Sequence, residues 1–124
     1  MLSLKIYQII TYIIRPFFFI FFCIRILNNK EEKGKFYERK GFSRNKRPPG
    51  KLIWIHAASV GETLSALPLI EGLLSSSSNY NILLTTGTKT SKNLVTERNL
   101  KRVIHQYFPW DAKTYCDRFL NNWR

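Results

Sequence analysis

The chain has 124 residues and carries 20 lysines and arginines against 8 aspartates and glutamates, for a formal net charge of +12. This length allows one domain at most. A disulfide scaffold is excluded because the chain has only 2 cysteines and Cys23 lies in an apolar segment, and two free thiols fit a reducing compartment. Composition divides the chain into residues 1–27, 28–50 and 51–124.

The first region, residues 1–27, is predicted to be a membrane anchor. The run from Ile6 to Leu27 is almost wholly apolar, and about 22 residues at about 1.5 Å each can cross a hydrocarbon core of about 30 Å. Arg15 and Pro16 oppose a clean span, because a central charge costs about 2.5–3.5 kcal/mol and proline removes a helix hydrogen bond. The six phenylalanine and isoleucine side chains at 17–22 outweigh them. No small-residue cleavage site follows, which indicates an uncleaved anchor.

A helix lying in the membrane interface is the alternative for this region. Lys5, Gln8, Tyr12 and Arg15 recur at helical spacing and could face the lipid headgroups. For either form, only Lys5 precedes the apolar run, whereas many positive charges follow it. The positive-inside rule therefore predicts that the rest of the chain is cytoplasmic.

The second region, residues 28–50, is predicted to be a basic connector. Nine lysines and arginines and three glutamates lie between Asn28 and Lys51, which is half of the net charge. The ordinary interpretation is a solvated linker, and its position beside an anchor raises contact with anionic lipid headgroups as a specific alternative, which we rank above nucleic-acid binding. Nucleic-acid binding is not expected, because few aromatic residues are interleaved and no RNA- or DNA-binding signature is present.

The third region, residues 51–124, alternates between strand and helix patterns. Strands are expected at 52–57, 82–86 and 103–108, the first of them buried on both faces. Helices are expected along 66–74, after a loop opened by Gly87, and over 112–123 with Asp111 as its N-cap. The last helix should turn one side inward: Tyr115, Cys116, Phe119, Leu120 and Trp123. Three such repeats predict a parallel α/β sheet of Rossmann-like type.

The start of the first of these helices is left open by the sequence. Gly61 can take a positive φ in a tight turn after the first strand. The helix then begins near Ser65, with Pro68 in its first turn, or at Glu62, with Pro68 bending it.

A candidate site lies where the loops after the strands should meet. Ligands of parallel sheets bind at the carboxyl ends of the strands, where 58–62, 85–90 and 109–111 would gather. Glu62 is the one candidate base with an obvious place, although composition alone favours a helix-start residue that interacts with the helix dipole. His56 and His105 are expected to be core or supporting histidines, and no metal spacing exists with the cysteines. Residues 87–90 resemble a phosphate-binding loop but lack its G-x-x-x-x-G-K-[ST] spacing.

Several short blocks resemble one enzyme family in order and spacing. The sequence is similar to the amino-terminal part of the 3-deoxy-D-manno-octulosonic-acid (Kdo) transferases over nearly all of its length. The blocks that carry the similarity are residues 39–41 (RKG), 47–48 (RP), 53–62 (IWIHAASVGE), 66–70 (ALPLI), 84–88 (LTTGT), 105–111 (HQYFPWD) and 118–120 (RFL). An apolar amino-terminal anchor belongs to the same pattern.

The resemblance implies the amino-terminal half of a GT-B glycosyltransferase at the bacterial inner membrane. Such a half binds the lipid A precursor, while a carboxyl-terminal domain binds CMP-Kdo, and no cofactor is used. Glu62 matches the catalytic base of the family, which reverses the preference stated above. Candidate substrate-binding residues in the same loops are Ser59, Gly61, Thr86, Thr88 and Lys89.

The resemblance also sets what the chain is expected to lack. The donor domain of the family is absent, so we expect a fragment that is inactive alone and a separate carboxyl-terminal half as a candidate partner. The alternative function is a non-catalytic membrane-surface protein that binds anionic lipid through its basic connector.

Overall fold

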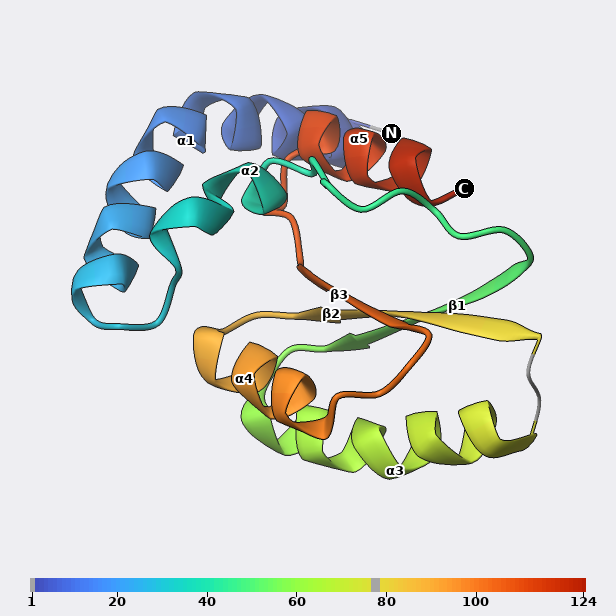
Figure 1. Ribbon diagram of the computed structural model, residues 1–124. Helices are drawn as coiled ribbons and strands as arrows, with labels where there is room; N and C mark the ends of the chain where they lie inside the picture. The colour runs from blue at the N-terminus through green and yellow to red at the C-terminus, as the bar shows by residue number, and fades with distance from the viewer. Residues whose placement is uncertain (1, 77–78) are drawn as a thin grey trace. The chain divides into compact units, whose positions relative to one another are not determined.

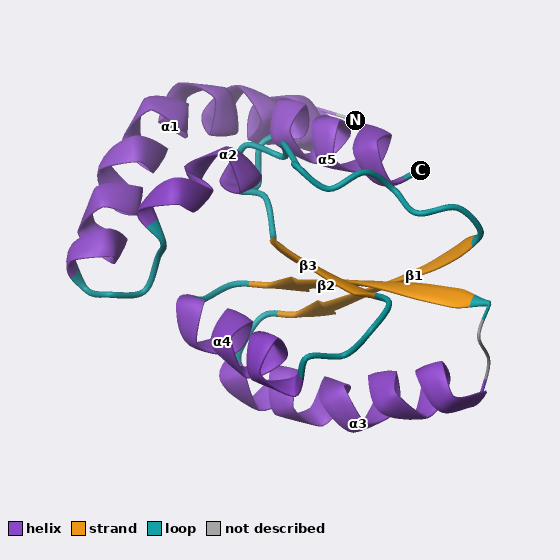
Figure 2. Cartoon of the chain, in the orientation of Figure 1, coloured by secondary structure: helices purple, strands orange, loops and turns teal. Residues whose placement is uncertain are grey.

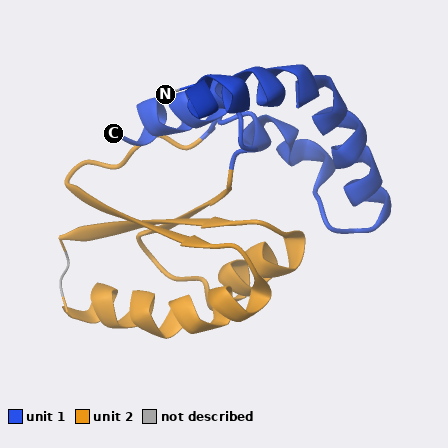
Figure 3. Ribbon diagram, turned by 180° about the vertical axis from the view of Figure 1, so that it is seen from behind, with its two compact units in different colours: residues 1–44, 109–124 blue, residues 45–108 orange. Residues whose placement is uncertain are grey.

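A computed structural model describes residues 2–76 and 79–124. The elements in chain order are α1 (Leu2–Leu27), the 3-10 helix η1 (Lys33–Lys35), α2 (Phe36–Arg39), β1 (Lys51–Ala57), α3 (Val60–Ser76), β2 (Tyr80–Thr86), α4 (Lys89–Arg98), β3 (Val103–Tyr107) and α5 (Lys113–Trp123) (Figures 1 and 2). They form two compact units, coloured in Figure 3. Unit 1 comprises residues up to 44 together with 109–124, and unit 2 comprises residues 45–108.

Unit 2 is built on a three-stranded parallel sheet. The strand order is β1-β2-β3, with Ile55 opposite Leu84 and Ile82 opposite Val103. Helices α3 and α4 connect the strands and cover one face of the sheet (Figure 1). The predicted α/β fold with a parallel sheet is therefore confirmed, with strand ends within two residues of those expected.

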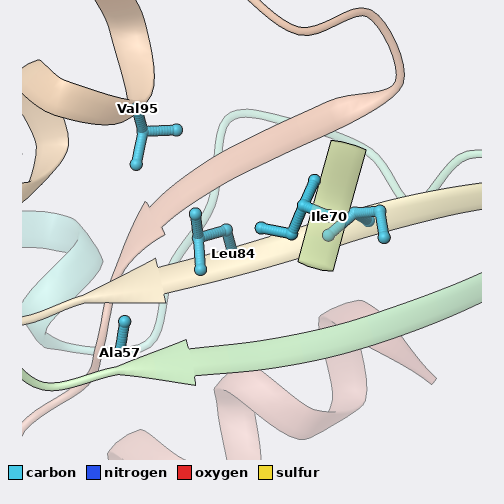
Figure 4. Close-up of a cluster of buried hydrophobic side chains, with 5 residues drawn as sticks. Ala57, Ile70, Leu84 and Val95 are labelled. Atoms are coloured by element: carbon cyan, nitrogen blue, oxygen red, sulfur yellow. The ribbon is translucent and has the colours of Figure 1, made fainter. Parts of the chain in front are cut away.

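The core of unit 2 lies between that face and the two helices. Side chains alternate across a strand, so Ile82 and Leu84 point to the same face. They pack with Ala57 of β1, Ile70 of α3 and Val95 of α4, and all five are buried (Figure 4). This core fixes the relative positions of the strands whose ends form the candidate site.

Strand β1 differs from its prediction. It was expected to be buried on both faces, but Lys51 and His56 are exposed and Trp54 keeps 45% of its surface accessible. The reason is topological, because in the described residues β1 is an edge strand that pairs with β2 alone. The buried strand is the central β2, which is covered from Ile82 to Thr86.

Helix α3 begins at Val60, earlier than either predicted start. Gly61 therefore lies in the first turn, and its φ is not positive, unlike that of Gly41 and Gly50. A tight turn does follow β1, at residues 58–59, but the positive φ expected of Gly61 is wrong. Pro68 is inside the helix, where it supplies no N–H to the carbonyl one turn earlier.

Unit 1 contains the long apolar helix α1, and Figure 1 shows it curving along its length. Pro16 lies inside it and is a recognised cause of helix bending. Of the described helices it alone is long and apolar enough to cross a membrane. As far as Phe22, its less exposed residues follow one stripe at spacings of three and four: Gln8, Thr11, Arg15, Phe18 and Phe22.

An aromatic cluster joins α1 to the rest of unit 1. The ring centroids of Phe18 and Trp110 are 5.1 Å apart, and those of Phe22 and Phe36 are 4.8 Å apart. Phe36 also contacts Trp110 at 5.5 Å, and Phe18 lies 6.3 Å from Tyr115. The stripe of α1 therefore faces α2, α5 and the loop before α5.

The basic connector is partly folded, so the interpretation as a solvated linker does not hold for its first half. Glu31 is buried and accepts hydrogen bonds from Arg39 at 2.6 Å and Arg25 at 2.8 Å. Lys35 pairs with the buried Glu38 at 2.6 Å. Burial, the largest single influence, lowers the pKa of Lys35, but the hydrogen bond and charge of Glu38 together with Tyr37 raise it overall. Several positive charges of this segment are thus paired inside unit 1, while the division into anchor, connector and domain stays a prediction.

Helix α5 corrects two expectations. Its N-cap is Ala112, without a side-chain cap, and Asp111 instead accepts a hydrogen bond from the Tyr7 hydroxyl. Its buried side chains are Tyr115, Phe119 and Trp123, one turn apart on a single face. Leu120 is 38% exposed and Cys116 half-buried, because each is rotated about 100° from that face.

Candidate functional site at the carboxyl ends of the strands

The three strands end beside one another. Ala57 pairs with Thr86, and Thr86 with Tyr107, so the loops after β1, β2 and β3 all leave from the same edge. The first two loops touch: a Cβ added to Gly87 would lie 2.9 Å from the Ala58 carbonyl oxygen. The predicted meeting of these two loops is confirmed, and it explains why glycine occupies position 87. Residues 109–111 belong to unit 1.

Glu62 lies in the first turn of α3, and its side chain folds back over the turn. Its carboxylate Oε2 accepts a hydrogen bond from the Ala58 N–H at 2.7 Å. In return, the Ser59 hydroxyl accepts one from the Glu62 N–H at 3.2 Å. This reciprocal pattern is close to a capping box, in which both side chains satisfy amides at a helix start. Glu62 therefore has the helix-start role that composition favoured.

The same geometry leaves the Glu62 carboxylate available for chemistry. Glu62, Ser59 and Ala58 are all exposed. Within the described residues, Oε1 of Glu62 has no hydrogen-bond partner, while Oε2 is held by Ala58. An oriented carboxylate with one open oxygen, at the ligand-binding edge of a parallel sheet, can accept a proton from a bound hydroxyl.

The five predicted substrate-binding residues are not equally open to this edge. Ser59 and Gly61 are exposed beside Glu62. Thr88 caps α4: its hydroxyl accepts from the Ser91 N–H at 3.2 Å and donates to the Ser91 hydroxyl at 3.0 Å. Lys89 is half-buried at the start of α4. Their role in binding stays a prediction.

Thr86 stands apart from that group because its side chain points into the interior. The residue is fully buried, and its Oγ1 lies 2.8 Å from Nε2 of His105. His105 is half-buried there, as expected for a supporting histidine.

A second group of side chains near this edge was not foreseen from the sequence. Oγ1 of Thr85 lies 3.0 Å from both Nε1 of Trp54 and Nδ1 of His56. The Phe108 ring contacts His56 at 4.3 Å and stacks near Trp54 at 6.3 Å between centroids. His56 is exposed, so the core role is excluded for it, and the supporting role, the other one expected, stays a prediction. The alternation of Trp54 and His56 along β1 was the signal that could have found this cluster.

Neither a metal site nor an activated thiol is evident in the described residues. No three His, Cys, Asp or Glu side chains gather as a metal ion would require in 2–76 and 79–124. Both cysteines there are free. Burial, with the nearby Asp111 carboxylate, raises the pKa of the Cys116 thiol. A raised pKa leaves less thiolate, which is the opposite of the shift that activates a nucleophilic cysteine.

The sequence blocks that lie in unit 1 pack against one another. The Trp110 N–H donates to the Arg39 carbonyl at 2.9 Å, and the Arg118 guanidinium donates to the Lys40 carbonyl at 2.7 Å. Gly41 lies so close to α5 that an added Cβ would be 2.1 Å from the Tyr115 carbonyl oxygen. The blocks at 39–41 and 118–120, and Trp110 of the block at 105–111, are thus in contact within unit 1.

Comparison with known proteins identifies one family. A family model described as 3-deoxy-D-manno-octulosonic-acid transferase (kdotransferase) matches residues 34–124. A probable mitochondrial 3-deoxy-D-manno-octulosonic acid transferase of Arabidopsis thaliana is 34% identical over 120 residues, which cover 97% of this chain and 27% of the relative. The transferase of Rickettsia bellii is 31% identical over 121 residues, covering 98% and 29% respectively.

A relative from a third organism gives the same result. The 3-deoxy-D-manno-octulosonic acid transferase of Haemophilus influenzae is 33% identical over 116 residues, covering 93% of this chain and 27% of the relative. The chain therefore spans somewhat more than a quarter of the length of these relatives. No solved structure matches the chain.

Proposed function

The chain belongs to the 3-deoxy-D-manno-octulosonic-acid transferase family, and from this premise we propose that it forms the acceptor-binding part of an enzyme that transfers Kdo from CMP-Kdo to a lipid A precursor. The observation that carries the proposal is the exposed Glu62 carboxylate, held by the Ala58 N–H at the carboxyl edge of the sheet. Lone carboxylates at helix starts are common, so the family membership is what gives this one a chemical role.

In the proposed reaction Glu62 is the general base. A sugar hydroxyl of the acceptor gives its proton to the open Oε1 of Glu62 as its oxygen attacks the anomeric carbon of Kdo. The bond between that carbon and the phosphate oxygen of CMP breaks, CMP leaves with the electron pair, and the configuration inverts. The hydrogen bond from Ala58 supports this role because it fixes the carboxylate before the acceptor arrives.

We further propose that these 124 residues do not catalyse transfer alone. The chain spans 27–29% of its relatives in Arabidopsis thaliana and Rickettsia bellii, and the donor CMP-Kdo would be bound by a carboxyl-terminal domain. The apolar helix α1 would hold the chain at the cytoplasmic side of the bacterial inner membrane, where a lipid acceptor is found.

The alternative function is a non-catalytic protein that binds anionic lipid through its basic connector. The structure of that connector supports it less well than the sequence did. Arg39 and Lys35 of that connector are engaged with Glu31 and Glu38 inside unit 1. Fewer of its charges are therefore free for a membrane surface than the sequence suggested.

A chimera tests the proposed function. These 124 residues replace the matching amino-terminal part of the Rickettsia bellii relative, and Kdo transfer is measured in detergent with CMP-Kdo and a lipid A precursor. We expect an active chimera, and a loss of about a hundredfold or more in Glu62→Gln, as for removal of a general base. The amide oxygen of the introduced glutamine can still accept from the Ala58 N–H, so the helix start should persist.

The matched control is Glu71→Gln. Glu71 lies on the same helix, in an exposed pair with Arg98 at 3.1 Å, and its substitution should leave activity unchanged. A folded chimera without activity would contradict the acceptor-binding role. Full activity of Glu62→Gln would show that the base is a different residue.

A further inference from the structure

Unit 1 contains a cavity of about 360 Å³ between α1 and the aromatic side chains around α2 and α5. Its charged lining consists of Arg15 and Lys40, and rings of Phe36, Trp110 and Tyr115 form much of its wall. This combination of two cations with an aromatic wall is unusual for a helix that the sequence describes as an anchor.

The two cations are not neutralised by carboxylates. The Arg15 guanidinium lies over the Tyr115 ring at 4.8 Å, and the Lys40 ammonium lies over the Phe36 ring at 4.5 Å. In the described residues neither head group has an ion-pair partner. Asp117, which lines a neighbouring cavity with Arg15, is paired with Lys113. Aromatic faces attract cations but accept few of their hydrogen bonds, so the donors of both groups remain available.

The cavity adjoins apolar surface. Phe19 lines it and is exposed, and its neighbours Phe17 and Ile20 are exposed as well. An anion held by Arg15 and Lys40 could therefore carry a hydrocarbon chain that continues over the outer face of α1. A phosphate group has several oxygens for the donors of two cations, and arginine binds it in a bidentate manner.

We propose that this cavity binds the phosphate group of an anionic membrane lipid, with its acyl chains lying along the exposed face of α1. The site would orient unit 1 on the membrane surface. The inference does not rest on the proposed transfer reaction, because it uses neither Glu62 nor the sheet, and lipid binding and Kdo transfer can fail separately.

The test uses the intact chain in mild detergent and follows Trp110, which is in the cavity wall. Short-chain phosphatidic acid should change tryptophan emission in a saturable way. Diacylglycerol with the same chains lacks the phosphate, and inorganic phosphate lacks the chains, so both should bind far more weakly. Trp110→Phe should abolish the signal, and Trp54→Phe should retain it.

Charge-matched variants identify the cations involved. Arg15→Gln with Lys40→Gln removes two positive charges, as does the control pair Lys30→Gln with Lys33→Gln. The first pair should weaken phosphatidic acid binding by about tenfold or more beyond the loss in the control pair, because it also removes charged hydrogen bonds to the ligand. Lys30 and Lys33 are exposed and lie outside the cavity lining. Arg15→Lys with Lys40→Arg should restore most of the binding.

Three results would overturn the inference. Equal binding of diacylglycerol would show that the phosphate group is not recognised. Saturable binding of inorganic phosphate alone would show that the lipid chains are not needed. Equal losses of phosphatidic acid binding in the two charge-matched pairs would show that binding depends on diffuse electrostatic attraction and not on this cavity. The comparison of ligands on the unaltered chain needs no cavity variant, so it decides the matter even if Arg15→Gln with Lys40→Gln does not fold.

Discussion

Gly41 follows α2 closely and has a φ of +81°, a conformation that residues with a side chain rarely adopt. The backbone there passes so close to α5 that a Cβ would lie 2.1 Å from the Tyr115 carbonyl oxygen. That oxygen belongs to a helix and cannot move aside as a flexible side chain could. Both the conformation and the space at position 41 therefore require glycine.

We expect Gly41→Ala to lower the free energy of unfolding by more than about 2 kcal/mol, because strain and a backbone clash act together. Gly34→Ala is the control, since a Cβ there meets nothing within 4 Å and the φ is not positive. Its effect should stay within about 0.5 kcal/mol. Urea unfolding of the chain in detergent, followed by circular dichroism, measures both. Similar stabilities of the two variants would refute the close packing of Gly41 on α5.

Single residues also show where sequence reasoning reached its limit. Glu62 could be found by its place before a helix, and its capping contacts to Ala58 and Ser59 follow from the S-x-x-E spacing. The burial of Thr86 against His105 could not be predicted from the sequence, because it depends on the pairing of β2 with β3. Two candidate residues at the same edge of the sheet thus differ in accessibility for a reason that only the sheet supplies.

Among the elements, α3 shows how a helix tolerates poor helix formers. It contains Gly61, Pro68 and Gly72, yet extends from Val60 to Ser76. Its apolar side packs on the sheet through Leu67 and Ile70, which are fully buried. Burial of that side stabilises the helix more than its two glycines weaken it.

Gly72 offers a way to measure this compensation. A Cβ at Gly72 meets nothing within 4 Å, so Gly72→Ala should raise the free energy of unfolding by about 0.5–1 kcal/mol through reduced freedom of the unfolded chain. Gly87→Ala is the contrasting variant, because its Cβ would lie 2.9 Å from the Ala58 carbonyl oxygen and should destabilise. The two shifts in unfolding midpoint should have opposite signs. A destabilised Gly72→Ala would mean that α3 is not continuous at this point.

The alternation of strand and helix could be read from the sequence because each element has its own apolar period. The edge position of β1 could not be read from the sequence, since an apolar run such as Leu52–Ala57 is compatible with both a central and an edge strand. The connector was misjudged for a different reason. Its charges suggested solvent, but Glu31 meets Arg25 and Arg39 only after the chain has folded back on itself. Composition cannot reveal pairs of that kind.

For the whole molecule, the question is how a helix that is long and apolar enough to cross a membrane can also be part of a protein unit. An anchor surrounded by lipid would present equivalent apolar faces on all sides. In unit 1 the faces of α1 differ: Phe22 is 3% exposed against Phe36 and Trp110, whereas Phe17 and Phe21 are 61% and 50% exposed. The helix is thus part of the packing of unit 1 as well as its most apolar surface.

Two pairs of Phe→Ala substitutions distinguish the role of the packed face of α1 from that of its exposed face. Phe18→Ala with Phe22→Ala removes rings that contact Trp110, Tyr115 and Phe36. A buried Phe→Ala change such as that of Phe22 costs about 3–5 kcal/mol, and loss of the partly buried Phe18 ring adds to it, so unit 1 should lose its fold. Phe17→Ala with Phe21→Ala removes exposed rings and should leave unfolding nearly unchanged. It should instead weaken partition into vesicles, because about 1.5–3 kcal/mol of transfer free energy is lost for each ring.

Near-ultraviolet circular dichroism and vesicle flotation of both variants give the two measurements. A helix surrounded by lipid predicts equal losses of partition and no difference in fold between the pairs. A loss of tertiary signal confined to Phe18→Ala with Phe22→Ala would instead mean that α1 cannot be removed without exposing Trp110 and Phe36. Deleting residues 2–27 to obtain a soluble form would then disrupt unit 1, since the deletion takes away one wall of its aromatic cluster.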